Sequence, residues 1–215
     1  DEPAGSTVPA AVGRGGKAAS ARKNALPEKA VLAVLPLALQ PELATLVDSP
    51  PEDADEWIYE IKFDGYRILT RIEGEKVQLF TRSGLDWSHK LPELVKAIRR
   101  IKLKPGWLDG EITVLDEKGI PDFQALQNAF DSSHTGSIVY YLFDLPFYDG
   151  YDFRQVPLSE RRKWLQAILK APLPDEIRLS DNFDVPPGDI LASACKLGLE
   201  GVIGKRKNSP YVSRR

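Results

Sequence analysis

Residues Trp57 to Arg67 read WIYEIKFDGYR, and the other motifs of the chain follow this stretch in the sequence. Apolar and polar side chains alternate along its first residues, which is typical of a β-strand with one face toward a core. The alternation places Lys62 on the same face as Glu60, and Asp64 follows on that side where the strand ends. Gly65 then allows a sharp turn with positive φ. A lysine facing away from a core is either half of a surface ion pair or a reactive amine.

The composition is that of an ordinary globular protein. With 215 residues, of which 42% are hydrophobic and 28% charged, the chain can form one substantial domain or two small ones. The formal net charge is −2, which gives no overall basic signature of a nucleic-acid-binding protein. Any contact with nucleic acid therefore requires a local basic patch.

Cysteine usage and hydropathy indicate the compartment. The single cysteine, Cys195, excludes an internal disulfide and favours a reducing compartment, so we expect a cytoplasmic protein. Cys195 lies on an apolar predicted helix, where we expect an inert buried thiol. The longest apolar run, Val31 to Leu39, is broken by Pro36, so no membrane-spanning segment is expected. The absence of methionine, even at position 1, predicts a fragment of a longer protein.

The chain divides into a linker and a folded part. Residues 1–24 are rich in Ala, Gly, Ser and Pro and predict a flexible linker. The alternative for this segment is a basic arm that contacts nucleic acid through its scattered Arg and Lys residues. Residues 25–215 are expected to form one domain, with order beginning near residues 35–47.

The folded part predicts strands with helices between them. Residues 66–73 and 76–81 form a hairpin by pattern, closed by a turn at Gly74. Further strands are predicted at residues 106–115, 137–143, 177–180 and 200–205. Helices are predicted at residues 91–100, 123–130 with Asp122 as N-cap, 159–169 with Ser159 as cap, and 189–197. The fold class is therefore α+β with largely antiparallel sheets and flanking helices.

Charged residues collect on the polar faces of these strands. Asp109 and Glu111 share one face of their strand, and Glu200 and Lys205 lie on the last strand. Carboxylates from several strands near one lysine suit a metal-assisted phosphate site, because hard oxygen ligands hold Mg²⁺ and the metal neutralises phosphate charge. The lysine could hold a phosphate or act as a nucleophile. A nucleophilic lysine must lose its proton, which a nearby cation favours and nearby carboxylates oppose.

Each residue taken singly also has an ordinary structural interpretation. Glu60 and Lys62 could form a solvated ion pair, and Phe143 alone is more often a core residue than a platform for a ligand. The basic clusters at residues 161–163 and 205–207 could be solvated surface or could contact DNA phosphates.

Five motifs occur together in a fixed order. Residues 62–67 (KFDGYR) match the pattern KxDGxR, which alone would occur by chance in about one in a thousand chains of this length. The others are residues 81–84 (TRSG), 108–111 (LDGE), 141–145 (YLFDL) and 200–205 (EGVIGK). The set resembles the motifs of the covalent nucleotidyltransferases, specifically the ATP-dependent DNA ligases. The residues within these motifs most resemble the ligase module of bacterial ligase D, the end-joining ligase that works with Ku.

This resemblance implies a fold and a reaction. Residues 25–215 would adopt the ATP-grasp-like fold of a nucleotidyltransferase (adenylation) domain, and the C-terminal OB domain of the family would be absent from this chain. Lysyl-AMP would form from ATP, and AMP would pass to a DNA 5′-phosphate for strand sealing in double-strand break repair by end joining. The expected partners are nicked or broken duplex DNA, Ku and other domains of the parent polypeptide. A monomer in the bacterial cytoplasm, associated with the nucleoid, is expected.

The resemblance assigns the catalytic residue and the residues around the base. Lys62 would attack the α-phosphorus of ATP and release pyrophosphate. Glu60 would accept the adenine amino group, Ile61 would contact the nucleotide beside it, and Phe143 would stack on adenine. Asp64 is expected to brace the turn at Gly65.

The resemblance also assigns the ribose, phosphate and metal contacts. Arg67 would contact the ribose or a phosphate, Arg82 would bind the ribose or the DNA 5′-phosphate, and Lys205 would contact the α-phosphate. Glu111 would hold the ribose hydroxyls or a metal ion. Glu111 and Glu200 are the predicted ligands of Mg²⁺ or Mn²⁺.

Two alternatives stay open. An RNA ligase or a capping-type nucleotidyltransferase would use the same lysine chemistry, although Arg67 and the FDL sequence at residues 143–145 favour a DNA ligase. A non-catalytic binding module could also retain the same fold.

Overall fold

The computed structural model describes residues 26–170, 172–183 and 187–213, so the predicted linker at residues 1–24 lies outside the described part. The strands are β1 (Val31–Leu32), β2 (Trp57–Lys62), β3 (Tyr66–Glu73), β4 (Lys76–Thr81), β5 (Gly106–Val114), β6 (Ile138–Tyr148), β7 (Tyr151–Asp152), β8 (Ile177–Leu179) and β9 (Gly201–Arg206). The α-helices are α1 (Pro92–Ile101), α2 (Phe123–Asp131), α3 (Leu158–Ile168) and α4 (Pro187–Leu197). Short 3-10 helices span Ala54–Glu56, Ser88–Lys90 and Thr135–Ser137.

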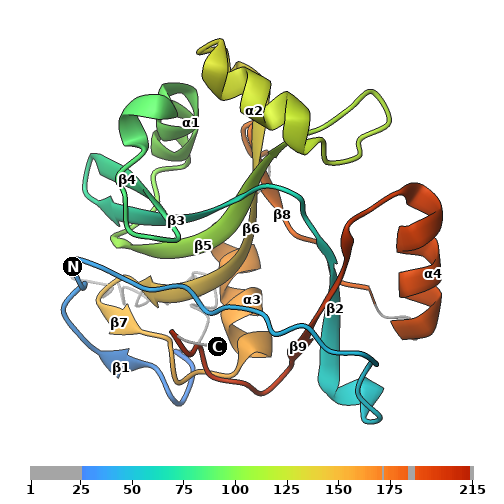
Figure 1. Ribbon diagram of the computed structural model, residues 1–215. Coiled ribbons are helices and arrows are strands. Elements are labelled where there is room, and N and C mark those ends of the chain that lie inside the picture. The colour runs from blue at the N-terminus through green and yellow to red at the C-terminus, as the bar shows by residue number, and fades with distance from the viewer. Residues whose placement is uncertain (1–25, 171, 184–186, 214–215) are drawn as a thin grey trace, which may run out of the picture.

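The strands form two sheets. Among the described residues, seven strands make one sheet in the order β1-β7-β6-β5-β3-β4, with β8 added to β6. The second sheet contains β2 and β9. All pairs are antiparallel except β6 with β8, which confirms the predicted α+β class with largely antiparallel sheets. Figure 1 shows α1 and α2 above the central strands, α3 below β6, and α4 beyond β9.

The two faces of the large sheet bury different apolar clusters, because neighbouring residues of a strand point to opposite faces. Ile68 and Leu108 belong to the main core, which α1, α2 and α3 cover. Leu69 and Trp107 belong to a smaller cluster that also contains Leu39 of the N-terminal strap, defined here as residues 26–53. The expected ordered segment near residues 35–47 therefore covers part of the core.

The hairpin and the Asp122 cap are confirmed. β3 and β4 have the predicted bounds, and Gly74 in the turn between them has a φ of 59°. Asp122 Oδ1 accepts a hydrogen bond of 2.9 Å from the backbone N–H of Ala125, as an N-cap does.

The predicted Ser159 cap is wrong. α3 begins at Leu158, with Pro157 at the N-cap position and no capping side chain. The backbone N–H of Leu158 instead donates to the Ser209 carbonyl at 3.0 Å, and that of Ser159 to the Lys207 carbonyl at 2.9 Å. The chain after β9 thus satisfies the free N–H groups of this helix end, which removes the need for a capping side chain.

The prediction of a buried thiol at Cys195 is also wrong, because this cysteine is exposed. α4 packs against β9 and turns Ile190 and Ala194, one helical turn apart, toward the protein. Cys195 lies one residue beyond Ala194 and so faces away from that contact. Within the described ranges, no helix has the length and apolarity needed to cross a membrane.

Candidate active site

Lys62 lies at the end of β2, where the two-stranded sheet opens. It pairs in register with Gly201, so Glu200 lies directly beside it, and the two side chains form an ion pair. Both side chains are about two-fifths exposed, at 41% and 39%. They line a small cleft of about 120 Å³, together with Asp64, Pro121, Gly198 and Leu199. The candidate nucleophile is therefore accessible, and its ammonium is paired.

Glu60, two residues earlier on β2, is 2% exposed. Its Oε1 accepts a 2.6 Å hydrogen bond from Arg162 Nη1. Its Oε2 accepts from Ser180 Oγ at 2.9 Å and from Lys205 Nζ at 3.0 Å. The structure therefore excludes a solvated Glu60–Lys62 pair, since Glu60 is a buried carboxylate with three donors and Lys62 pairs with Glu200.

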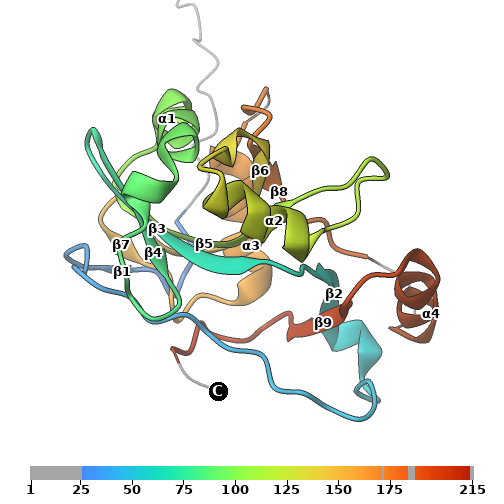
Figure 2. The same cartoon turned by 45° about the horizontal axis from the view of Figure 1, so that its top comes forward.

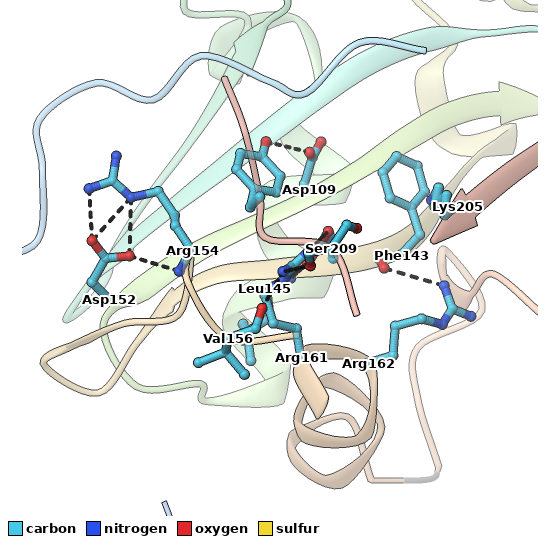
Figure 3. Close-up of polar contacts among 12 residues, drawn as sticks. Asp109, Phe143, Leu145, Asp152, Arg154, Val156, Arg161, Arg162, Lys205 and Ser209 are labelled. Atoms are coloured by element: carbon cyan, nitrogen blue, oxygen red, sulfur yellow. Dashed lines mark hydrogen bonds and ion pairs between the residues drawn. The ribbon is translucent and has the colours of Figure 1, made fainter. Parts of the chain in front are cut away.

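Phe143 on β6 is 6% exposed and lies close to two cations. The Arg67 guanidinium carbon is 4.5 Å from the centre of its ring, and Lys205 Nζ is 4.0 Å from it. Figure 3 shows Lys205 beside the ring. Since Lys205 also binds Glu60, one ammonium contacts both residues predicted to recognise adenine. The ring is thus covered by side chains that a stacking base has to displace.

Arg67 on β3 forms a bidentate ion pair with Asp109, at 2.5 Å and 2.7 Å. The fully buried Asp109 also accepts a 2.6 Å hydrogen bond from the Tyr211 hydroxyl. Burial acts to lower the pKa of Arg67, but the Asp109 carboxylate outweighs it and raises that pKa above its usual value. Arg67 therefore remains charged, with most of its donors used inside the protein.

Glu111 lies opposite Arg67 in the β3–β5 register. Burial raises the pKa of Glu111 to about 7, the nearby Asp109 adds to this, and Arg67, Lys62 and Lys205 act against it. A bulge in the β5–β6 pairing lies just before this residue, at Asp109 and Gly110, where bulges commonly redirect side chains. Gly110 is required there, since a Cβ would lie 2.3 Å from the Tyr141 carbonyl oxygen.

A metal site formed by Glu111 and Glu200 stays a prediction. In the part of the chain that the structure describes, no three His, Cys, Asp or Glu residues are grouped so that they could hold a metal ion. Two carboxylates nevertheless supply the oxygen ligands that a hard divalent cation prefers, and burial, the main cause of the raised pKa of Glu111, would be offset by a bound cation.

The raised pKa of Glu111 predicts a pH-dependent stability. The folded protein holds the proton of Glu111 up to a pH of about 7, whereas the unfolded chain loses it near 4.5. Folding therefore takes up a proton between these values, and the free energy of unfolding falls as the pH rises through that window. Without divalent metal, we expect wild type to lose up to about 3 kcal/mol relative to Glu111→Gln from pH 4.5 to 7.5. Urea unfolding of both proteins across this range measures the difference, and parallel curves would contradict the assignment.

Two further predicted site residues are Ile61 and Arg82. Ile61 is half-buried on β2 and pairs with Val202. Arg82 is exposed in the turn after β4, the edge strand beyond β3. Across residues 26–170, 172–183 and 187–213, Arg82 forms no hydrogen bond or ion pair.

Most side chains of the two basic clusters, at residues 161–163 and 205–207, bind other groups of the protein. Arg161 and Arg162 are 0% and 6% exposed, so neither is available to a DNA phosphate. Arg206 pairs with Asp53, and Lys207 Nζ donates to the Asp55 carbonyl at 2.5 Å. These contacts hold the end of the N-terminal strap against β9.

The sequence interpretation missed several residues that complete the site. They are Arg162 and Ser180 around Glu60, and Tyr211 beside Asp109 and Arg67. Glu42 of the strap is another, because its carbonyl accepts from Arg67 Nη2 at 3.3 Å. Asp109 was predicted only as a possible carboxylate of a metal site, whereas it binds Arg67. Glu42, Arg162 and Ser180 lie at least 17 residues from the nearest motif, and Tyr211 lies six residues after the last one.

A larger hollow of about 320 Å³ lies elsewhere. Its lining residues are Tyr66, Trp87, Lys90, Gln124, Gln127, Phe130 and Asp131. It contains none of the predicted site residues. Its aromatic rings mostly contact one another, edge-on or tilted, as in a satellite of the core. We therefore place the chemistry at the smaller cleft beside Lys62.

Comparison with known proteins identifies the family. The family described as "ATP dependent DNA ligase domain" matches residues 41–215, and the chain belongs to it. The chain is 54% identical over 181 residues to the multifunctional non-homologous end joining protein LigD of Pseudomonas aeruginosa, covering 84% of this chain and 21% of that protein. It is 35% identical over 183 residues to LigD of Mycobacterium tuberculosis, covering 82% and 22%. The chain thus spans about a fifth of the length of these relatives.

Solved structures agree with the sequence comparison. The ligase domain of M. tuberculosis LigD matches with a TM-score of 0.70 at 31% identity, covering 82% of this chain and 56% of that one. A mycobacterial DNA ligase D complexed with ATP and MES matches with a TM-score of 0.69 at 31% identity, covering 82% and 57%. The Chlorella virus DNA ligase-adenylate, at 18% identity and a TM-score of 0.60, shares the fold. These matches confirm the predicted nucleotidyltransferase fold and the resemblance to ligase D.

Proposed function

We propose that residues 25–215 are the adenylation domain of an ATP-dependent DNA ligase and that Lys62 is its nucleophile. The observation that carries the proposal is the position of Lys62. Its amine lies at the mouth of a cleft, paired with Glu200, at the end of the strand that also carries the buried Glu60. The lysine is thus accessible to a phosphate while its strand is held rigidly by the rest of the site.

In the first step, Lys62 Nζ loses a proton and attacks the α-phosphorus of ATP. A nitrogen–phosphorus bond forms, the bond from the α-phosphorus to the bridging oxygen breaks, and pyrophosphate leaves with the electron pair of that bond. The proton leaves to solvent, to which the Lys62 side chain is 41% exposed. Glu111 and Glu200 would hold Mg²⁺ or Mn²⁺, which would offset the negative charge of the phosphates.

At the other end of the site, Glu60 accepts the adenine amino group, Ile61 lies beside the base, and Phe143 stacks on it. Nucleotide sites usually measure about 300–1,000 Å³, which exceeds the cleft beside Lys62. ATP therefore has to displace side chains, and Lys205 is the evident one, because it covers both Glu60 and Phe143. Once released, Lys205 is free to contact the α-phosphate. Arg67, through the donors that Asp109 and Glu42 do not use, and Arg82 are the proposed contacts to the ribose or a phosphate.

The later steps are proposed from the family and its relatives. AMP passes from Lys62 to a DNA 5′-phosphate, and the 3′-hydroxyl of the adjoining strand then displaces AMP to seal the break. The name of the LigD relatives supports a role in non-homologous end joining of broken duplex DNA. With that role, Ku and the other domains of the parent polypeptide are the proposed partners, at the nucleoid of a bacterial cell.

Labelling with ATP tests the proposal directly. Incubation with ATP labelled at the α-phosphate is expected to give an acid-labile covalent adduct, and intact mass measurement should show an increase of one AMP. Label at the γ-phosphate should not be retained, because pyrophosphate leaves. Uptake of neither label at excess ATP would contradict the proposal. Labelling by GTP in place of ATP would indicate a capping-type enzyme instead.

A further inference from the structure

Two adjacent arginines of α3 are buried, and they bind different parts of the protein. Arg161 pairs with Asp144 and donates to the carbonyls of Val156 and Ser209. Arg162 extends toward β6 and β2 instead. Figure 3 shows the two side chains leaving the helix in different directions, with Arg162 bound to the Phe143 carbonyl. The pair therefore offers a natural comparison between a structural arginine and one directed at the active site.

Arg162 connects the groups that are proposed to recognise the base. Its Nη1 donates to Glu60 Oε1 at 2.6 Å and to the Phe143 carbonyl at 3.3 Å. Its Nη2 donates to the Ser180 carbonyl at 2.6 Å, and Ser180 Oγ in turn donates to Glu60 Oε2 at 2.9 Å. Because a guanidinium is planar and rigid, these bonds fix Glu60 relative to the backbone of Phe143.

Glu60 still has room for one more donor. A carboxylate offers about four lone-pair sites, and Arg162, Ser180 and Lys205 use three of them. Arg162 and Ser180 are 6% and 3% exposed and have further partners, so they are fixed. The Lys205 side chain is 23% exposed and sits on the other strand of the small sheet, so it is the partner that a ligand can replace.

We propose that Arg162, assisted by Ser180, is a positioning residue that orients Glu60 to accept the 6-amino group of adenine and so sets the preference for an adenine nucleotide. The inference rests on the proposed function and adds the residue that makes Glu60 selective. Because Arg162 and Ser180 hold the buried Glu60 carboxylate in one orientation, Glu60 can accept a further hydrogen bond only from a donor at the remaining lone-pair position. Loss of a 6-amino group then leaves a buried acceptor without its donor, which is costly.

The experiment compares ATP with purine riboside triphosphate, which lacks only the 6-amino group, in single-turnover adduct formation. Arg162→Lys keeps the positive charge but cannot make the forked bonds. We expect it to lower the preference for ATP, measured as the ratio of rate over KM, by about tenfold, mainly through the KM for ATP. Arg161→Lys is the matched control, since it removes the same forked geometry one residue away, and it should keep the wild-type ratio even where it lowers stability.

Ser180→Ala is the milder test if Arg162→Lys folds poorly. It removes one hydrogen bond to Glu60 and should lower the preference for ATP over purine riboside triphosphate by several-fold. Unchanged ratios in Arg162→Lys and Ser180→Ala would overturn the inference, as would an equal fall in Arg161→Lys. A wild type that forms no adduct with either nucleotide would refute the proposed function instead, so the two failures are distinguishable.

Discussion

Lys62→Arg is expected to fold like the wild type and to form no covalent adduct with AMP. Arginine can keep the ion pair with Glu200, so the mouth of the cleft should retain its charges. A guanidinium stays protonated in proteins and cannot act as the nucleophile. We expect uptake of label from the α-phosphate of ATP to fall by more than about a thousandfold, as when a covalent nucleophile is removed.

The control for this variant is Lys163→Arg. Lys163 is also an exposed lysine paired with a glutamate, Glu160, but it lies on α3 outside the site. Lys163→Arg should label like the wild type, and both variants should share its thermal midpoint. Adduct formation by Lys62→Arg, confirmed by intact mass, would show that another residue is the nucleophile.

Arg161→Met is expected to cost about 3–5 kcal/mol of folding free energy, a large part of the 5–15 kcal/mol typical of a domain. Arg161 is fully buried and forms a bidentate pair with Asp144, at 2.7 Å and 2.9 Å. Burial by itself raises the pKa of Asp144, but Arg161 outweighs it and holds that pKa below its usual value. Removing the arginine leaves a buried carboxylate without its counter-ion. Urea unfolding at pH 7 measures the loss.

The pH dependence of this loss identifies its cause. In the wild type, the depressed pKa of Asp144 contributes stability at neutral pH that is lost on acidification. In Arg161→Met the same carboxyl should be protonated more readily, so the deficit should shrink as the pH falls. The double variant Arg161→Met/Asp144→Leu should recover part of the stability, because it removes the unpaired charge. A deficit that is independent of pH would point to lost packing instead.

Local patterns in the sequence predicted the elements well. The hairpin of β3 and β4, α1 and β5 each depend on alternation, helical spacing or turn residues within about ten positions. Short strands such as β1 and β7 were missed, since two residues are too few to show a period. The predicted cap at Ser159 failed because carbonyls from the far end of the chain satisfy that helix terminus.

Contacts within the site were harder to predict, because they join distant residues. The three partners of Glu60 lie 102, 120 and 145 residues away in the sequence. The burial of Arg161 and Arg162 nevertheless had a local signal. Leu158, Arg161, Arg162 and Leu165 have the i, i+3, i+4, i+7 spacing of a core-facing helix stripe, and all four are buried. Their charge suggested a surface patch, whereas their spacing indicated the interior.

The pairing of β2 with β9 also bears on how the protein is made. Lys62 belongs to a strand whose ladder partner begins at Gly201, so the two-stranded sheet joins the early part of the chain to its last described strand (Figure 1 and Figure 2). Long-range pairings of this kind close late in folding. On the ribosome, the large sheet can assemble first, while Lys62 lacks its partners until Glu200 and Lys205 have emerged from the exit tunnel. A nascent chain therefore lacks part of the proposed nucleotide site until its synthesis has passed β9.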